Sequence, residues 1–320
     1  MIRFLISRGH GYTIRQVKKS RLAPRVRAMN YDRLLRSRFL RRATYIFTDL
    51  DRLGFWELEL AADIFLQLKN SGIKVLNNPA LAKTRYPLLR ALHNAGLNDF
   101  NVYRADEIQS IARFPVFLRK LQGHREPLSD LLETREELEK AISAAVARGI
   151  PMENLLAVEF AAEPVRPGLF RKLSAFRIGD VIVPHISVHD TAWLVKYGKL
   201  GIAGEELYRE ELNLLQTNPF AAHLKKVFDI AQIEYGRADF GFYQGRIQIY
   251  EINTNPTLVA PFQHPSAIRR QSLQFAWKTY LEALTAIDTP RGGWPARLAD
   301  GHLQRHRAWK NLLARSRKVH

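Results

Sequence analysis

The sequence predicts a mixed α/β protein of the α+β kind, and three observations predict it. Residues 44–78 alternate strand, helix and strand, as expected for a βαβ unit. Residues 237–244 and 246–253 are rich in β-branched and aromatic residues and are separated by Gly245, which favours an antiparallel hairpin. The 320 residues are 46% hydrophobic, so the chain can bury a sizeable core in two or three small lobes.

The elements follow in chain order, each from its own local pattern. Gly72 ends the first helix, because glycine readily adopts the left-handed conformation that follows a helix. Gly179-Asp180 separates two strand-like runs, and Asn218-Pro219 provides a cap and a first-turn proline for a later helix. We expect strands at 44–49, 74–78, 101–104, 114–120, 155–160, 170–180, 181–189, 237–244 and 246–253, and helices at 57–70, 79–94, 134–147, 220–234 and 264–285.

The hairpin at 237–253 brings oxygen ligands together. Asp239 lies near Glu251 on the partner strand, and Asn253 leaves the same face as Glu251 because strand side chains alternate with a period of two. Two opposed carboxylates destabilise a sheet unless a cation such as Mg²⁺, which prefers oxygen ligands, lies between them. Arg237 shares the face of Asp239 and could meet charge developing on a transferring oxygen. The alternative is a half-exposed hairpin with ordinary surface charges.

The residues of this hairpin resemble a known signature. Arg237-x-Asp239, then Glu251-x-Asn253 with Pro256 soon after, is similar to the motif that closes the active site of ATP-grasp enzymes, including D-Ala-D-Ala ligases and glutathione synthetases. The resemblance implies that Asp239, Glu251 and Asn253 bind Mg²⁺ bridging the ATP phosphates. It also implies that Arg237 stabilises an acyl phosphate or tetrahedral intermediate. In many of these ligases a glycine follows the proline, and this chain lacks it.

The same resemblance implies ATP contacts on earlier strands. Arg119 or Lys120, at the end of a short buried strand, would contact the phosphates. Glu159 ends an apolar run that resembles the hinge strand, where it would accept the ribose hydroxyls. Arg171 and Lys172 would point into the phosphate site from the start of the next strand, although edge-strand charges that discourage aggregation are an alternative.

Two further sets of residues are candidates without a motif. Asp49 and Asp51 suggest a pair of metal ligands, although acidic residues are common in loops after strands. Trp193, Lys196 and Tyr197 could line a substrate cleft, although an aromatic side chain packed over the sheet is the commoner arrangement.

The net charge of +18 is confined to the two ends of the chain. Residues 1–43 carry +12 and residues 291–320 carry +7, which leaves −1 for residues 44–290. Such ends could bind RNA, an anionic membrane surface or an acidic protein, and residues 1–43 also resemble an organelle transit peptide. The alternative is that they pack on the body or aid solubility.

We therefore divide the chain into four parts. These are a basic N-terminal extension (1–43), an abbreviated N-terminal α/β lobe with its linker (44–105), an ATP-grasp domain whose two α+β subdomains clamp ATP (106–290), and a basic, helical C-terminal extension (291–320).

The resemblance implies ATP and Mg²⁺ as cofactors of a carboxylate–amine ligase that forms an amide or peptide bond through an acyl phosphate. The carboxylate and the amine are not identified by the sequence. A kinase for an anionic small molecule, or a non-catalytic nucleotide sensor that binds RNA or membranes, are the alternatives. The chain has no cysteine, which excludes disulfides and thiolate metal sites and is compatible with the cytoplasm, our expected location. No apolar run approaches the roughly 20 residues of a membrane span.

Overall fold

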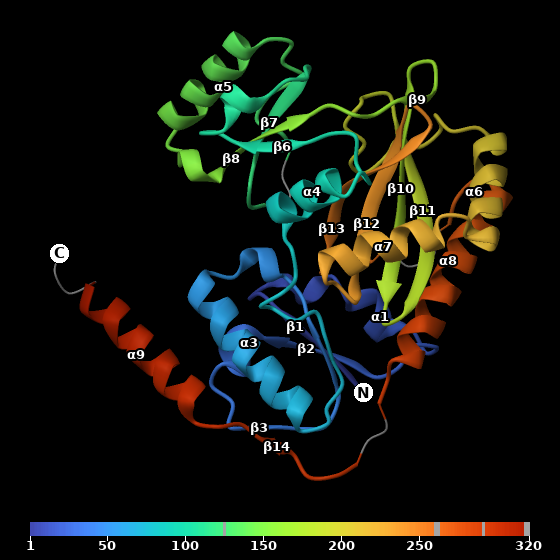
Figure 1. Ribbon diagram of the computed structural model, residues 1–320. Helices are drawn as coiled ribbons and strands as arrows, with labels where there is room; N and C mark the ends of the chain where they lie inside the picture. Colours follow the sequence, from blue (N-terminus) through green and yellow to red (C-terminus); the bar gives the residue numbers. More distant parts are fainter. Residues whose placement is uncertain (124–125, 259–262, 290–291, 317–320) are drawn as a thin grey trace.

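The computed structural model describes residues 1–123, 126–258, 263–289 and 292–316, and in these residues it contains four β-sheets (Figure 1). The N-terminal lobe is a parallel sheet with the strand order β2-β1-β4-β5. Its elements are β1 (Ile2–Ile6), α1 (Arg15–Lys19), β2 (Val26–Asn30), α2 (Tyr31–Leu34), β4 (Thr44–Phe47), α3 (Phe55–Asn70) and β5 (Val75–Leu76), with short 3₁₀ turns at His10–Tyr12 and Leu50–Arg52.

The two faces of this sheet bury different parts of the chain. Leu5, Tyr45 and Phe47 pack against α3 on one face. Ile2 and Ile46, on the other face, pack against α8 (Ala267–Ala286), so a helix from late in the chain closes the core of the first lobe.

Residues 1–43 are not an extension, contrary to the prediction. Strand β1 lies in the middle of the parallel sheet, paired with β2 on one side and β4 on the other. Ile2, Phe4 and Leu5 are fully buried. Net charge was a poor guide here, because β1 contains a single cation, Arg3, among apolar residues that are buried.

The small sheet of the second lobe has the order β6-β8-β7, formed by β6 (Val102–Arg104), β7 (Val116–Lys120) and β8 (Leu155–Glu159). One face packs on α5 (Arg135–Ala147) through Leu118 and Ala157. The opposite face carries Phe117, Leu156 and Val158. Short 3₁₀ turns at Ile108–Ser110 and Met152–Asn154 complete this part.

The large antiparallel sheet has the order β11-β10-β12-β13 and faces the small sheet (Figure 1). Its strands are β10 (Leu169–Ile178), β11 (Val181–Asp190), β12 (Tyr235–Tyr243) and β13 (Arg246–Asn253), and β9 (Pro164–Arg166) pairs with β10. Helices α4 (Arg85–Asn94) and α7 (Ala221–Ala231) cover one face, whereas α8 packs on the other. Helix α6 (Glu205–Thr217) contacts α8 and β11.

Two details of this region bear on the sequence predictions. The turn of the β12–β13 hairpin has positive φ at both Gln244 and Gly245, as a type I′ turn requires, and Asp239 pairs with Glu251. The helix predicted at 79–94 begins only at Arg85, because the preceding segment is tied to α7 by a hydrogen bond from the Lys83 amide to the Ala231 carbonyl (2.8 Å).

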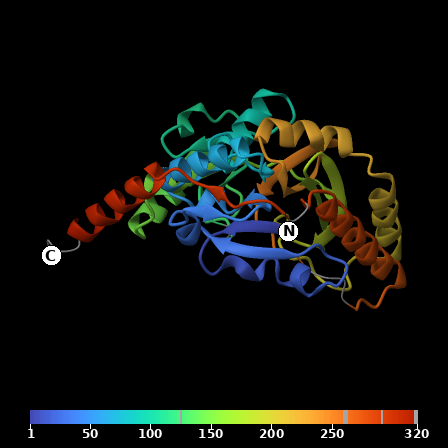
Figure 2. The ribbon, with the colours of Figure 1, turned by 90° about the horizontal axis from the view of Figure 1, so that it is seen from below.

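The C-terminal segment returns to the N-terminal lobe. Strand β14 (Ala296–Arg297) pairs with β3 (Phe39–Leu40), and α9 (Gly301–Ser316) begins against α3 and then leads away from the lobes (Figure 2). Residues 291 and 317–320 of the predicted C-terminal extension lie outside the described residues. Among the helices that the structure describes, none is long and apolar enough to cross a membrane.

Candidate active site

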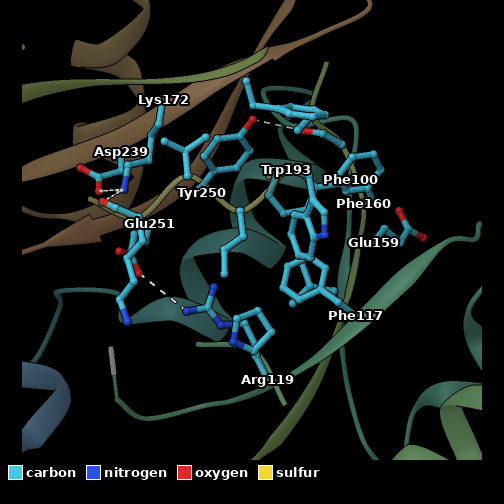
Figure 3. Close-up of a pocket in the computed structure, with 18 of the residues that line it drawn as sticks. Phe100, Phe117, Arg119, Glu159, Phe160, Lys172, Trp193, Asp239, Tyr250 and Glu251 are labelled. Atoms are coloured by element: carbon cyan, nitrogen blue, oxygen red, sulfur yellow. Dashed lines mark hydrogen bonds and ion pairs between the residues drawn. The ribbon is translucent and has the colours of Figure 1, made fainter. Parts of the chain in front are cut away.

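A pocket lies between the small sheet and the large sheet, and Figure 3 shows that its walls are largely aromatic. The Trp193 ring lies 5.0 Å from that of Phe117 and 5.5 Å from that of Phe160, measured between centroids. Tyr250 and Phe100 complete this wall. Apolar, aromatic walls with a few polar groups at one end are typical of sites for small ligands with a planar ring.

The opposed carboxylates lie at the polar end of the pocket. Asp239 on β12 faces Glu251 on β13 and is only 2% exposed. The Asn253 amide donates to Glu251 Oε1 (3.3 Å), so the three oxygen-bearing side chains of the predicted metal site are neighbours. Because two carboxylates this close repel each other, their surroundings must supply positive charge.

Basic side chains surround Asp239. Arg237 donates from Nε and a terminal nitrogen to the two carboxylate oxygens (2.7 and 3.2 Å), and Lys172 Nζ lies 3.2 Å from Oδ2. Burial opposes the charged form of Arg237, but Asp239 outweighs it and raises the pKa of the guanidinium. His185, against the same strands, has its pKa lowered to about 3 by removal from water and by Arg237, so its ring is neutral.

Glu251 lies beside two arginines, one on α4 and one on β7. Arg85 donates to Oε2 (2.8 Å), and Arg119 lies 3.9 Å from the same oxygen. Burial and the neighbouring Arg85 lower the pKa of Arg119 to about 10, which still leaves it charged at neutral pH. The basic groups around the two carboxylates therefore outnumber them, which suits a polyanion such as a nucleotide polyphosphate.

The structure distinguishes between the two predicted cations at the end of β7. Arg119 shares the face of Phe117 and lines the pocket. Lys120 shares the face of Leu118, which packs on α5, and it does not line the pocket. Of the two alternatives, only Arg119 lies in the pocket, beside Glu251.

Glu159 lies at the pocket, but its carboxylate already has protein partners. Its carboxylate accepts from the Asn101 amide (2.9 Å) and the Tyr103 hydroxyl (3.1 Å) and pairs with Arg113 (3.4 Å). Glu159 therefore lines the pocket together with Val158, but its carboxylate is already bound to groups of the second lobe. In Figure 3 its carboxylate lies at the far side of the aromatic wall from Asp239.

Arg171 and Lys172 both line the pocket but have different partners. Lys172 turns to Asp239, whereas Arg171 pairs with Glu210 of α6 (2.8 Å). Lys172 therefore lies at the polar end with the carboxylates, and Arg171 ties β10 to α6.

Sequence reasoning missed several residues of this site, among them Arg85, Glu163 and the aromatic residues Phe100, Phe117, Phe160 and Tyr250. Arg85 donates to the carbonyls of Lys120, Leu121 and Gly123 as well as to Glu251. A cation in the first turn of a helix opposes the helix dipole, and that unfavourable position was the available signal. Glu163 also lines the pocket and accepts from the Gln244 amide (2.7 Å).

Among the candidates without a motif, some line the pocket and others do not. Trp193 and Lys196 line the pocket, whereas Tyr197 is 83% exposed. No group of three or more His, Cys, Asp or Glu side chains converges in the described part of the chain, either at Asp49 and Asp51 or at the Asp239–Glu251 pair. Asp49 instead bonds to neighbouring protein groups.

Comparison with known proteins bears on the fold. No protein-family model matches the sequence, and the curated proteins searched contain no match. The ATP-grasp ligase PsnB in complex with a minimal precursor is similar over 89% of this chain and 98% of its own, with 13% identity and a TM-score of 0.50. PsnB with a minimal precursor, Mg and ADP is similar over 89% and 97%, with 14% identity and a TM-score of 0.50.

The D-alanine–D-alanine ligase of Bacillus anthracis matches 89% of this chain and 96% of its own at 10% identity, with a TM-score of 0.48. The two PsnB structures align with this chain over nearly their full length. This chain has the ATP-grasp fold.

Proposed function

We propose that this protein is an ATP- and Mg²⁺-dependent carboxylate–amine ligase, which joins an acid to an amine through an acyl phosphate. The observation that supports it most is the Asp239–Glu251 pair within a ring of cations, at the polar end of an aromatic pocket between two sheets. PsnB, a ligase of the same fold, has been solved with Mg and ADP, which supports the same cofactors here.

The residues present fit Mg²⁺. Two carboxylates and an amide oxygen from Asp239, Glu251 and Asn253 are hard oxygen donors, and Mg²⁺ in nucleotide enzymes commonly takes only part of its coordination shell from protein. When bound there, the ion would neutralise phosphate charge and hold the phosphates in line for transfer.

The chain's own side chains supply the rest of the site. Arg119 and Lys172 would bind the phosphates of ATP, and the aromatic wall would hold the adenine ring. Arg237 would stabilise charge on the acyl phosphate and on the tetrahedral intermediate, because its guanidinium is already oriented by Asp239. Catalysis would then depend on positioning and electrostatics, without a protein nucleophile.

The test measures phosphate release and the mass of the product. The protein is incubated with ATP, Mg²⁺ and a pool of amino acids and small carboxylic acids, with and without hydroxylamine, which converts an acyl phosphate into a hydroxamate. We expect phosphate release, a hydroxamate and a condensed product. A product heavier by one phosphoryl group would instead identify a kinase. If neither a condensed nor a phosphorylated product forms, the proposal is contradicted.

Asp239→Asn is the matched variant for this test. It keeps the shape of the side chain but removes a charge from the metal site, so we expect turnover to fall at least about 100-fold. Asp106→Asn, an exposed position outside the pocket, is the control and should turn over at the rate of the unmodified protein. Equal turnover in both variants would exclude Asp239 from the site.

A further inference from the structure

A second cluster of polar residues lies at the edge of the N-terminal sheet and is not part of the nucleotide pocket. Its centre is Asp49, which is 4% exposed and has a left-handed backbone (φ 54°) that costs a non-glycine residue energy. Asp49 Oδ2 accepts hydrogen bonds from the backbone amide of Ser7 (2.8 Å) and from the side-chain amide of Asn255 (3.0 Å). The same oxygen lies 3.3 Å from His10 Nδ1. Arg52 Nε lies 3.5 Å from the other oxygen.

The position of this cluster is that of a substrate site. Ser7 and Asp49 follow the carboxyl ends of the adjacent parallel strands β1 and β4, the edge at which open α/β sheets bind ligands. Asn255 comes two residues after Asn253 of the metal-binding hairpin, and the Leu258 amide donates to the Thr13 carbonyl (3.4 Å). A small cavity beside it is lined by Leu50, Thr254 and Glu251, so this edge borders the polar end of the nucleotide pocket.

His10 has the geometry of a base in this cluster. A hydrogen on Nδ1 donates to Asp49 and leaves the lone pair on Nε2, as an aspartate orients a catalytic histidine. Among the residues that the structure describes, none is bonded to Nε2, and the side chain is 23% exposed. The neighbouring Ser7 hydroxyl is buried and likewise has no partner in the described chain.

We propose that the His10–Asp49 pair is the general base that prepares the amine substrate for attack. The proposal rests on the proposed ligase function, because it concerns only the second half of that reaction. The class of substrate that it implies is one that enters as an ammonium group, such as the α-amino or side-chain amine of an amino acid.

The base acts on the amine before the amine attacks the acyl phosphate. Nε2 of His10 removes one proton from the ammonium group and later releases it to solvent. The freed lone pair forms the C–N bond with the carbonyl carbon of the acyl phosphate. The C–O bond to phosphate then breaks, and the phosphate leaves with the second proton of the amine. Asp49 stabilises the imidazolium that forms between these events.

The experiment separates the two half-reactions. Hydroxylamine is mostly uncharged at neutral pH and needs no base, whereas an amino acid enters as an ammonium group. With ATP, Mg²⁺ and the pooled amino acids and small acids, we expect His10→Ala to form hydroxamate within about twofold of the unmodified protein. Amide formation should fall about 100-fold, the usual contribution of general base catalysis, and added imidazole should restore part of it.

Two further variants complete the design. Asp49→Asn should weaken amide formation more than hydroxamate formation, because it removes the group that orients His10. Tyr12→Phe, whose ring lies 5.9 Å from that of His10, is the matched control and should leave both products unchanged. Equal effects of His10→Ala on the two products, or no effect on either, would overturn the proposal. If the unmodified protein forms no hydroxamate, the ligase function itself fails, and this inference fails with it.

Discussion

Arg85 shows how much of the site depends on one side chain. It connects three carbonyls at the end of β7 to Glu251 on β13, and its side chain is 8% exposed. Lysine keeps the charge but cannot reproduce the planar fork of donors. We expect Arg85→Lys to lower the free energy of unfolding by about 2–4 kcal/mol, because buried hydrogen bonds to charged groups are lost, and to weaken ATP binding about tenfold. Urea denaturation and calorimetric titration with ATP and Mg²⁺ measure the two effects.

The matched control for Arg85 is Arg148, an exposed arginine at the end of α5. Arg148→Lys should change neither the urea midpoint nor the affinity for ATP, since surface substitutions of this kind usually change stability by less than about 0.5 kcal/mol. If Arg85→Lys behaves like this control, the loop after β7 does not depend on the bond to Glu251.

At the scale of elements, β11 contains a pH-sensitive side chain. His189 is 5% exposed, and burial, followed by the charge of Arg171, lowers its pKa to about 4. In the unfolded chain its pKa is about 6.5, so between these values the unfolded state binds the extra proton and the free energy of unfolding falls as the pH drops. We expect His189→Phe to remove up to about 3 kcal/mol of the difference in stability between pH 7 and pH 4.

Urea denaturation at pH 7, 5.5 and 4.5 checks this prediction. The free energy of unfolding should fall more steeply with decreasing pH in the unmodified protein than in His189→Phe. Above the pKa of the unfolded histidine, the two plots of this free energy against pH should run parallel. Parallel loss of stability in both proteins would show that other groups account for the acid sensitivity.

Elements differ in how far the sequence predicts them. The β12–β13 hairpin was predictable, including the pairing of Asp239 with Glu251, because turn chemistry and side-chain alternation are local properties. Strand β1 was not, because its burial depends on α3 and α8, which lie far away in the sequence. The partners of Glu159, the Asn101 amide and the Tyr103 hydroxyl, were not predictable either, because the pairing of β6 with β8 is set by tertiary packing.

The whole molecule has a strong asymmetry of charge. The cations of residues 1–43 lie on a folded lobe, and exposed side chains on α1 and directly after it form what we term the basic face: Arg15, Lys18, Lys19 and Arg21. No ion pair joins any of these side chains to another residue within the described ranges. We propose that this face attracts an anionic partner, since unpaired surface cations raise the local concentration of polyanions.

The basic face leads to a prediction that salt can test. Replacing Arg15, Lys18 and Lys19 by Gln should weaken binding of poly-L-glutamate or of an RNA oligonucleotide, and it should flatten the dependence of affinity on salt between about 50 and 200 mM, because each lost contact releases one counterion fewer. Turnover with the pooled small substrates should not change, as these cations lie outside the pocket between the two sheets. The matched control replaces Lys140, Lys225 and Lys278 of α5, α7 and α8 by Gln, which alters the net charge equally. If both triple variants lose the same affinity, net charge accounts for the binding, whereas a loss confined to the first assigns it to the N-terminal lobe, and the stronger of the two probes identifies the class of partner.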